Sequence, residues 1–204
     1  MAFDAYRYND TQKIAYENGD HIEGLENVLY QCPVCGKEYT ITAEKNTLTC
    51  SACGYSVQSD VYGILTAKDE QRTVFRYPSD WHAYIEENVR NEIRSHPDYQ
   101  LETQATILQI NKKRHRYEPV GDGLVSLVPG KFRIDGNLYG KPFQQEFPTV
   151  DFPMLPFKPG KCFEIQKGSE IYRIQPRDGR IVMKWILTLK TAYQLRNAPV
   201  PEQV

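Results

Sequence analysis

Four cysteines between residues 32 and 53 carry the clearest chemical pattern in the sequence. They form two Cys-x-x-Cys pairs, Cys32/Cys35 and Cys50/Cys53, with 14 residues between the pairs. Each pair can place two thiolates on one side of a tight turn, here called a knuckle, and two facing knuckles offer four sulfurs in a tetrahedron. Zn²⁺ accepts this closed coordination in structural sites, where no position is left for water or substrate. We therefore predict one structural zinc ion per chain, held by these four cysteines.

The residues around the two pairs fit a metal site. Gly36 and Gly54 each follow the second cysteine of a pair, where a left-handed or cramped backbone is often needed. The gap between the pairs is one residue shorter than is usual for such a site, but it still fits a short β-hairpin with strands near 39–42 and 47–49. Two free dithiols or disulfides are the alternatives. A metal would also stabilise a short, loop-rich segment that has little core of its own.

The fifth cysteine, Cys162, lies in the stretch Lys161-Cys162-Phe163-Glu164-Ile165. We interpret it as a small buried hydrophobe in a strand, because no base is indicated beside it. The sequence also shows no nucleophile–base pairing, no phosphate-binding loop and no open metal site. We therefore predict no catalytic residue in this chain.

A second candidate site is the basic run from Lys112 to Arg116. Lys112, Lys113, Arg114 and Arg116 concentrate positive charge in a chain with 25 Lys and Arg against 26 Asp and Glu, a net charge of −1. Attraction to an anionic surface must therefore come from a local patch rather than from the whole protein. Because an unpaired buried charge is costly, we expect the run to be exposed between two strands. The alternative to a ligand site is a solvated hairpin tip.

The element pattern divides the chain into three parts. An N-terminal arm and a four-cysteine zinc ribbon occupy 1–65, and a linker with an amphipathic helix occupies 66–100. The helix is expected to begin at Ser79 or Asp80 and to end before Pro97, because apolar residues recur there at helical spacing. A β-rich part with a final helix fills 101–198.

Within the third part, alternating strands and turn signals precede an amphipathic helix. Turns are expected at 121–123 and 135–137, and a helix over 179–196, with Asp178 as its cap and Trp185 on its buried face. We therefore expect an α+β chain. A small zinc ribbon with four cysteine ligands and a linking helix would precede a bent antiparallel sheet or barrel, capped by the C-terminal helix.

The third part resembles the pleckstrin-homology and GRAM superfold over residues 101–196. The resemblance rests on the tryptophan inside the closing helix and on the glycine turn before an alternating strand. Domains of this kind often hold lipid phosphates with cations in a strand connection. The resemblance thus implies that Lys112, Lys113, Arg114 and Arg116 contact a lipid head group.

A second resemblance covers about residues 20–195. The stretches Gly24–Gly36, Tyr77–Trp81 and Leu155–Lys161 resemble the region that follows the catalytic domain in certain bacterial 1-acylglycerol-3-phosphate acyltransferase-like proteins. That family uses a histidine with an aspartate five positions later. Here the residues five positions after His21, His82, His96 and His115 are Glu26, Glu87, Leu101 and Val120. The resemblance therefore implies a non-catalytic accessory region in phospholipid synthesis, which binds membrane, lipid or a partner such as the acyltransferase core.

The alternative is a zinc-ribbon protein that binds nucleic acid. Lys37 and Lys45 in the expected hairpin are offset by Glu38 and Glu44, which disfavours contact with phosphates. The sequence has no apolar stretch near the ~20 residues of a membrane span and no apolar run at its start. Together with unpaired cysteines, this predicts a cytoplasmic protein, which a lipid role would place at the inner face of the cell membrane.

Overall fold

The computed structural model of the 204-residue chain describes residues 3–17, 20–68, 73–128, 130–149 and 152–196. The chain forms two compact units, Met1–Asn88 and Val89–Val204, which we describe separately. The division falls inside one helix, α2 (Pro78–Ser95). Within the described residues, no helix is both long and apolar enough to cross a membrane.

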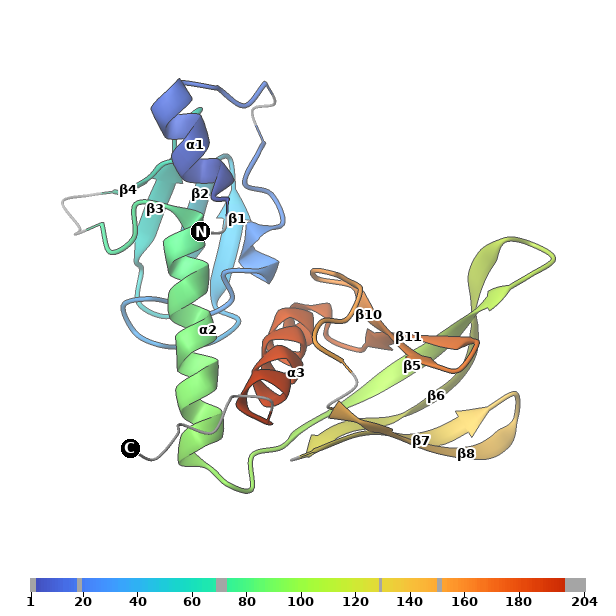
Figure 1. The fold of residues 1–204 in the computed structure, drawn as a ribbon. Helices are drawn as coiled ribbons and strands as arrows, with labels where there is room; N and C mark the ends of the chain where they lie inside the picture. The colour runs from blue at the N-terminus through green and yellow to red at the C-terminus, as the bar shows by residue number, and fades with distance from the viewer. Residues whose placement is uncertain (1–2, 18–19, 69–72, 129, 150–151, 197–204) are drawn as a thin grey trace. The chain divides into compact units, whose positions relative to one another are not determined.

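The first unit is built around a small antiparallel sheet whose four strands follow chain order (Figure 1). The strands are β1 (Ile41–Glu44), β2 (Thr47–Cys50), β3 (Ser56–Ser59) and β4 (Leu65–Ala67). The predicted hairpin between the cysteine pairs is confirmed as β1–β2.

Strand β4 begins only at Leu65, because the Asp60 carboxylate accepts hydrogen bonds from the N–H groups of Tyr62 and Ile64 and holds a turn before it. Helix α1 (Ala5–Gln12) was not predicted. None of its residues is buried, so it lacks the apolar stripe by which a helix is found in a sequence. A short 3-10 helix, η1 (Leu25–Asn27), leads to the first knuckle.

The first half of α2 packs into the core of the first unit. Trp81 and Ile85 are fully buried, as the helical spacing predicted. The Trp81 indole Nε1 donates to the Gln31 carbonyl at 2.8 Å, and the Asn88 amide donates to Gln31 Oε1 at 2.7 Å. Since Gln31 directly precedes Cys32, this helix fixes the position of the first knuckle.

The second unit contains a seven-stranded antiparallel sheet followed by a helix. The sheet order is β8-β7-β6-β5-β11-β10-β9, so the first strand, β5, pairs with both β6 and β11. The strands are β5 (Leu101–Asn111), β6 (Arg116–Val128), β7 (Lys131–Leu138), β8 (Lys141–Pro148), β9 (Phe157–Lys158), β10 (Cys162–Lys167) and β11 (Glu170–Pro176).

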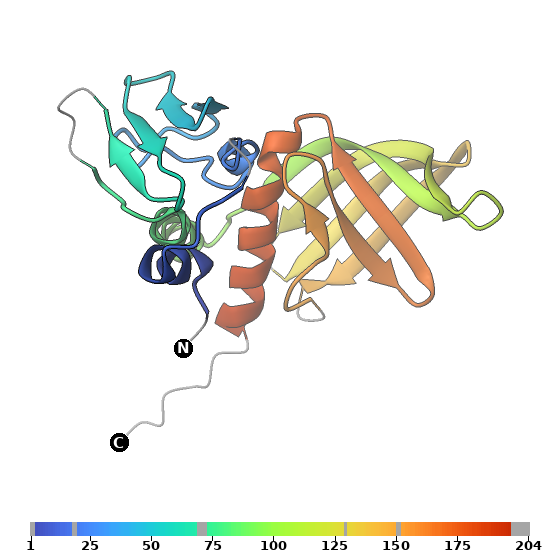
Figure 2. The same ribbon diagram turned by 90° about the horizontal axis from the view of Figure 1, so that it is seen from above.

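Aromatic contacts show that this sheet is strongly bent. Phe132 on β7 and Phe163 on β10 lie four strands apart in the sheet, which is about 19 Å in a flat sheet at ~4.8 Å per strand. Their ring centroids are nevertheless only 6.0 Å apart. Phe147 on β8 and Tyr172 on β11 likewise meet at 6.1 Å. The two ends of the sheet therefore face each other across one aromatic core, as the folded-over sheet in Figure 2 shows.

Helix α3 (Val182–Arg196), which follows the 3-10 turn η3 (Gly179–Ile181), covers this core. Asp178 caps η3 by accepting from the Arg180 N–H, as predicted. Trp185 is 2% exposed and stacks on Phe163, with ring centroids 5.8 Å apart. The α+β class, the antiparallel sheets and the buried C-terminal helix are thus confirmed.

Both predicted glycine turns in this unit are wrong. Residues 121–123 lie inside β6, and residues 135–137 lie inside β7. Gly123 pairs with Gly136 across the two strands, and a Cβ on Gly121 would overlap the Asn137 carbonyl. These glycines therefore allow the backbones of β6 and β7 to approach each other closely, and they do not reverse the chain direction. The β7–β8 turn is Tyr139-Gly140 instead, where both φ angles are positive.

Candidate metal centre and basic hairpin

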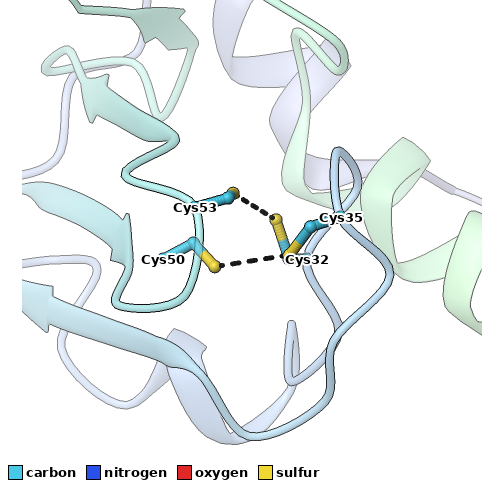
Figure 3. A group of neighbouring side chains, drawn as sticks. All are labelled: Cys32, Cys35, Cys50 and Cys53. Carbon is cyan, nitrogen blue, oxygen red and sulfur yellow. Dashed lines mark hydrogen bonds between the residues drawn. The ribbon is translucent and has the colours of Figure 1, made fainter.

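The four cysteines of the two knuckles form one cluster. Their Sγ atoms all lie within 4.8 Å of one another, with Cys32 and Cys53 at 3.7 Å and Cys35 and Cys50 at 3.8 Å (Figure 3). Four sulfurs around a metal at about 2.3 Å in a regular tetrahedron lie about 3.8 Å apart, whereas a disulfide needs about 2.0 Å. All four are free thiols. The cluster therefore has the dimensions of a four-thiolate metal site.

The two knuckles have the same backbone structure. The N–H of the glycine donates to the carbonyl of the first cysteine, at 3.0 Å from Gly36 to Cys32 and at 2.9 Å from Gly54 to Cys50. The N–H of each first cysteine in turn donates to the carbonyl five residues later, at 2.9 and 2.8 Å. Both glycines have the positive φ that was expected, 72° and 76°. Two equivalent turns thus present two sulfurs each toward a common centre.

The electrostatic surroundings differ between the first cysteines of the two knuckles, although both are fully buried. Burial raises the pKa of the Cys32 thiol to about 12. Burial also acts on Cys50, but hydrogen bonds from the Thr40 hydroxyl and from the N–H groups of Ala52 and Cys53 outweigh it and lower the pKa to about 6. Donors that stabilise a thiolate before any metal arrives favour metal binding, because the thiolate is the ligand.

The cluster can hold a metal but offers no route to catalysis at it. Four cysteine ligands complete a tetrahedral shell and leave no position for water. The hairpin beside it also lacks net positive charge: Lys45 lies 4.0 Å from Glu44, and both side chains are largely exposed.

The basic run lies where it was expected, at the connection between β5 and β6. Residues 112–115 form the turn, β6 begins at Arg116, and all five side chains are exposed. Arg114 and Arg116 both contact the same oxygen of Glu118, at 3.1 and 2.9 Å. Hydrogen bonds from Asn111, and then from the two arginines, lower the pKa of Glu118 to about 2, so this carboxylate stays charged.

The two lysines at the tip carry the available charge. Neither the Lys112 nor the Lys113 ammonium forms an ion pair or a side-chain hydrogen bond within the part of the chain that the structure describes. With Arg114 and Arg116 sharing one carboxylate, the hairpin tip keeps a net positive charge. The predicted exposure of the run is confirmed.

The structure adds residues that the sequence did not single out. Because the strands are antiparallel, the β7–β8 and β10–β11 turns lie at the same end of the sheet as the basic run, away from α3 (Figure 2). This end, here called the turn end, also presents Lys141 and Lys167. Ile110 is 48% exposed there and Tyr139 is 69% exposed. An apolar residue at a strand terminus beside a basic run was the only available signal.

Cys162 is the remaining candidate from the sequence. It begins strand β10, as predicted, but it is only partly buried. The strand is thus confirmed, but the interpretation of Cys162 as a buried hydrophobe is wrong, because alternate residues of β10 point away from the core, as the burial of its neighbour Phe163 indicates.

No protein-family model and no curated protein matches the chain. Among solved structures, one match is the Ran-binding domain of the nuclear complex component Nup2 from Ashbya gossypii. The identity is 17%, with 48% of this chain and 99% of that domain covered, at a TM-score of 0.36. Another is the Dm DCP1 EVH1 domain, solved with the XRN1 DBM peptide, at 8% identity, 62% and 98% coverage and a TM-score of 0.36. These TM-scores are too low to carry an assignment.

Proposed function

We propose that this chain is a non-catalytic accessory region of a bacterial 1-acylglycerol-3-phosphate acyltransferase-like protein of phospholipid synthesis. In this proposal Zn²⁺ stabilises the first unit, and the second unit binds an anionic membrane surface through its turn end. The chain would lie in the cytoplasm, at the inner face of the cell membrane. The resemblance of Gly24–Gly36 and Leu155–Lys161 to that family supports the parent protein.

Zinc is the metal that the cysteine cluster supports best. Soft thiolates in a tetrahedron select zinc or iron over harder cations, and the two equivalent knuckles match a structural zinc site. Elemental analysis should give one zinc per chain, and X-ray absorption should give four sulfur neighbours. Purified protein without metal, or a metal with fewer than four sulfurs, would overturn this assignment.

The strand order supports a pleckstrin-homology or GRAM-like second unit. A meander of four strands and a meander of three strands meet where β5 pairs with β11, and one helix covers the resulting core. This is the bent sheet with a closing helix that the sequence resemblance implied.

The observation that carries the membrane role is the pair of exposed ammonium groups at Lys112 and Lys113. Each basic residue near an anionic membrane surface contributes about 1 kcal/mol, and Lys141 and Lys167 lie at the same end of the sheet. The exposed ring of Tyr139 suits the boundary between polar and apolar layers, where one end of the side chain is apolar and the other is wet. Charge and apolar surface are thus combined at one end of the sheet.

Vesicle flotation tests the proposal. Binding to vesicles with an anionic phospholipid should be strong at low salt, should fall as salt rises, and should be absent with zwitterionic lipid alone. Replacing Lys112, Lys113 and Arg114 with serine should weaken binding about 100-fold, because about 3 kcal/mol is lost.

A matched control removes the same charge from the other end of the sheet. Lys158, Lys161 and Arg177 are exposed there, and their replacement with serine should leave vesicle binding within about twofold. If both triple variants lose vesicle binding equally, net charge alone explains the binding, and the proposal that the turn end is the binding surface is contradicted. No binding at low salt would leave the basic run as a solvated tip. Binding of single-stranded RNA instead would favour the nucleic-acid alternative.

The parent protein has a separate test. An in-frame acyltransferase core encoded before Met1 in the genome would support the accessory role. A stop codon directly before Met1, with no acyltransferase that co-purifies with the chain, would contradict it.

A further inference from the structure

The second unit contains an apolar cavity that the proposed function does not use. It lies between the end of α2 with the turn after it, the end of β6, and the last turns of α3, and its volume is about 300 Å³. The walls are mainly aliphatic: Ile93, Pro97, Leu127, Val128, Ala192 and Leu195. This volume lies at the lower limit of about 300–1,000 Å³ that is usual for small-molecule sites.

Few of the side chains that line the cavity are polar. Thr188 is 1% exposed, and its Oγ1 lies 3.5 Å from the Tyr99 hydroxyl, a long hydrogen bond that leaves the threonine oxygen with acceptor capacity. His96 also lines the cavity, and its Nδ1 is 2.9 Å from the Glu92 carbonyl. Apart from Arg196, the polar side chains that line the cavity are thus two hydroxyls and one imidazole, and none of them is a carboxylate.

Arg196 is the one arginine among the described residues that line the cavity. It is exposed, and its guanidinium forms no ion pair or hydrogen bond within the described residues. Its Nη1 would be 2.6 Å from a Cβ on Gly130, so the guanidinium lies directly against this glycine, which also lines the cavity. A positive group with five donors thus stands among the aliphatic side chains of a cavity that is open to solvent.

We infer that this cavity binds a single-chain amphiphile with an anionic head group. The alkyl chain would fill the aliphatic walls, and a carboxylate or phosphate would pair with Arg196. At about 30 Å³ for a unit the size of a water molecule, the cavity volume sets an upper limit of about ten carbons on the part of the chain that it covers. The guanidinium geometry matches the two oxygens of either head group.

Decanoate and decyl phosphate are the probes that test the inference, and calorimetric titration of the full chain measures their binding. Both should bind, whereas decanol should bind at least tenfold more weakly and decyltrimethylammonium should not bind. If only one of the two anions binds, the head-group class is thereby identified. Arg196→Gln should weaken anion binding at least tenfold, while the exposed control Arg180→Gln should leave it unchanged.

A substitution that fills the cavity provides a second test of the inference. Ala192→Phe should abolish binding of both anions without lowering the melting temperature by more than a few degrees, because residue 192 faces the cavity. Equal binding of decanol and decanoate, or no effect of Arg196→Gln, would overturn the inference. This outcome is separable from the membrane role, because none of these variants touches the turn end and vesicle flotation should be unchanged in all of them.

Discussion

Replacing Trp185 with alanine removes the side chain on which the core of the second unit is centred. The ring is 2% exposed and its centroid lies 6.0 Å from that of Phe132 and 5.8 Å from that of Phe163. A buried indole of this kind removes about 200 Å² of apolar surface from water. At about 25 cal/mol per Å², this burial contributes about 5 kcal/mol to the free energy of unfolding. The value does not include the cavity that alanine would leave or the Cβ that alanine retains. We therefore expect a loss of about 3–5 kcal/mol, the usual range for a large buried aromatic.

Calorimetry of the full chain should measure this loss as a fall of about 10–20 °C in the transition of the second unit. Trp185→Phe should cost much less, because it keeps an aromatic ring between the two phenylalanines. Met154→Ala is the surface control, since Met154 is 56% exposed, and should change stability by less than about 0.5 kcal/mol. A loss below about 1 kcal/mol for Trp185→Ala would refute the account of the core.

Three further predictions concern the metal centre, the paired strands and the basic hairpin. Cys50→Ser should release the metal and unfold residues 30–60, with hydrogen exchange in the second unit unchanged; retained zinc would contradict the assignment. Gly121→Ala should destabilise by about 3 kcal/mol or more because the new Cβ overlaps backbone, whereas Gly168→Ala, at an open turn with positive φ, should cost only about 1–2 kcal/mol in denaturant titrations. The Glu118 carboxyl should titrate near pH 2 by NMR. Its depressed pKa contributes stability above its unfolded pKa of about 4.5, and this is lost as pH falls toward 2; an ordinary titration near 4.5 would contradict the pairing.

The features that local sequence patterns determine were predicted correctly. The spacing of the cysteines and the glycines after them determine both knuckles, since each knuckle is closed by hydrogen bonds within six residues. The burial of Trp81 and Trp185 follows from helical periodicity, which depends only on neighbours along the chain.

The features that depend on distant partners were not predicted. Gly121 and Gly136 look like turn residues until the register of β6 against β7 shows what lies opposite each of them. The grouping of Tyr139 with the basic run likewise depends on strand pairing, because 22 residues separate it from Arg116 in the sequence. Local sequence patterns contain no information on the pairing of β6 with β7 or on the position of Tyr139 near the basic run.

The proposed membrane-binding face is tested most directly by hydrogen exchange with and without anionic vesicles. The account predicts slowed exchange at three segments of the turn end, residues 110–117, 138–141 and 167–170, and unchanged exchange at the opposite end around 158–161. Zwitterionic vesicles should produce no change. Protection confined to the knuckles or to residues 158–161, or no protection at any segment, would contradict the proposal that this protein meets anionic lipid through the basic hairpin.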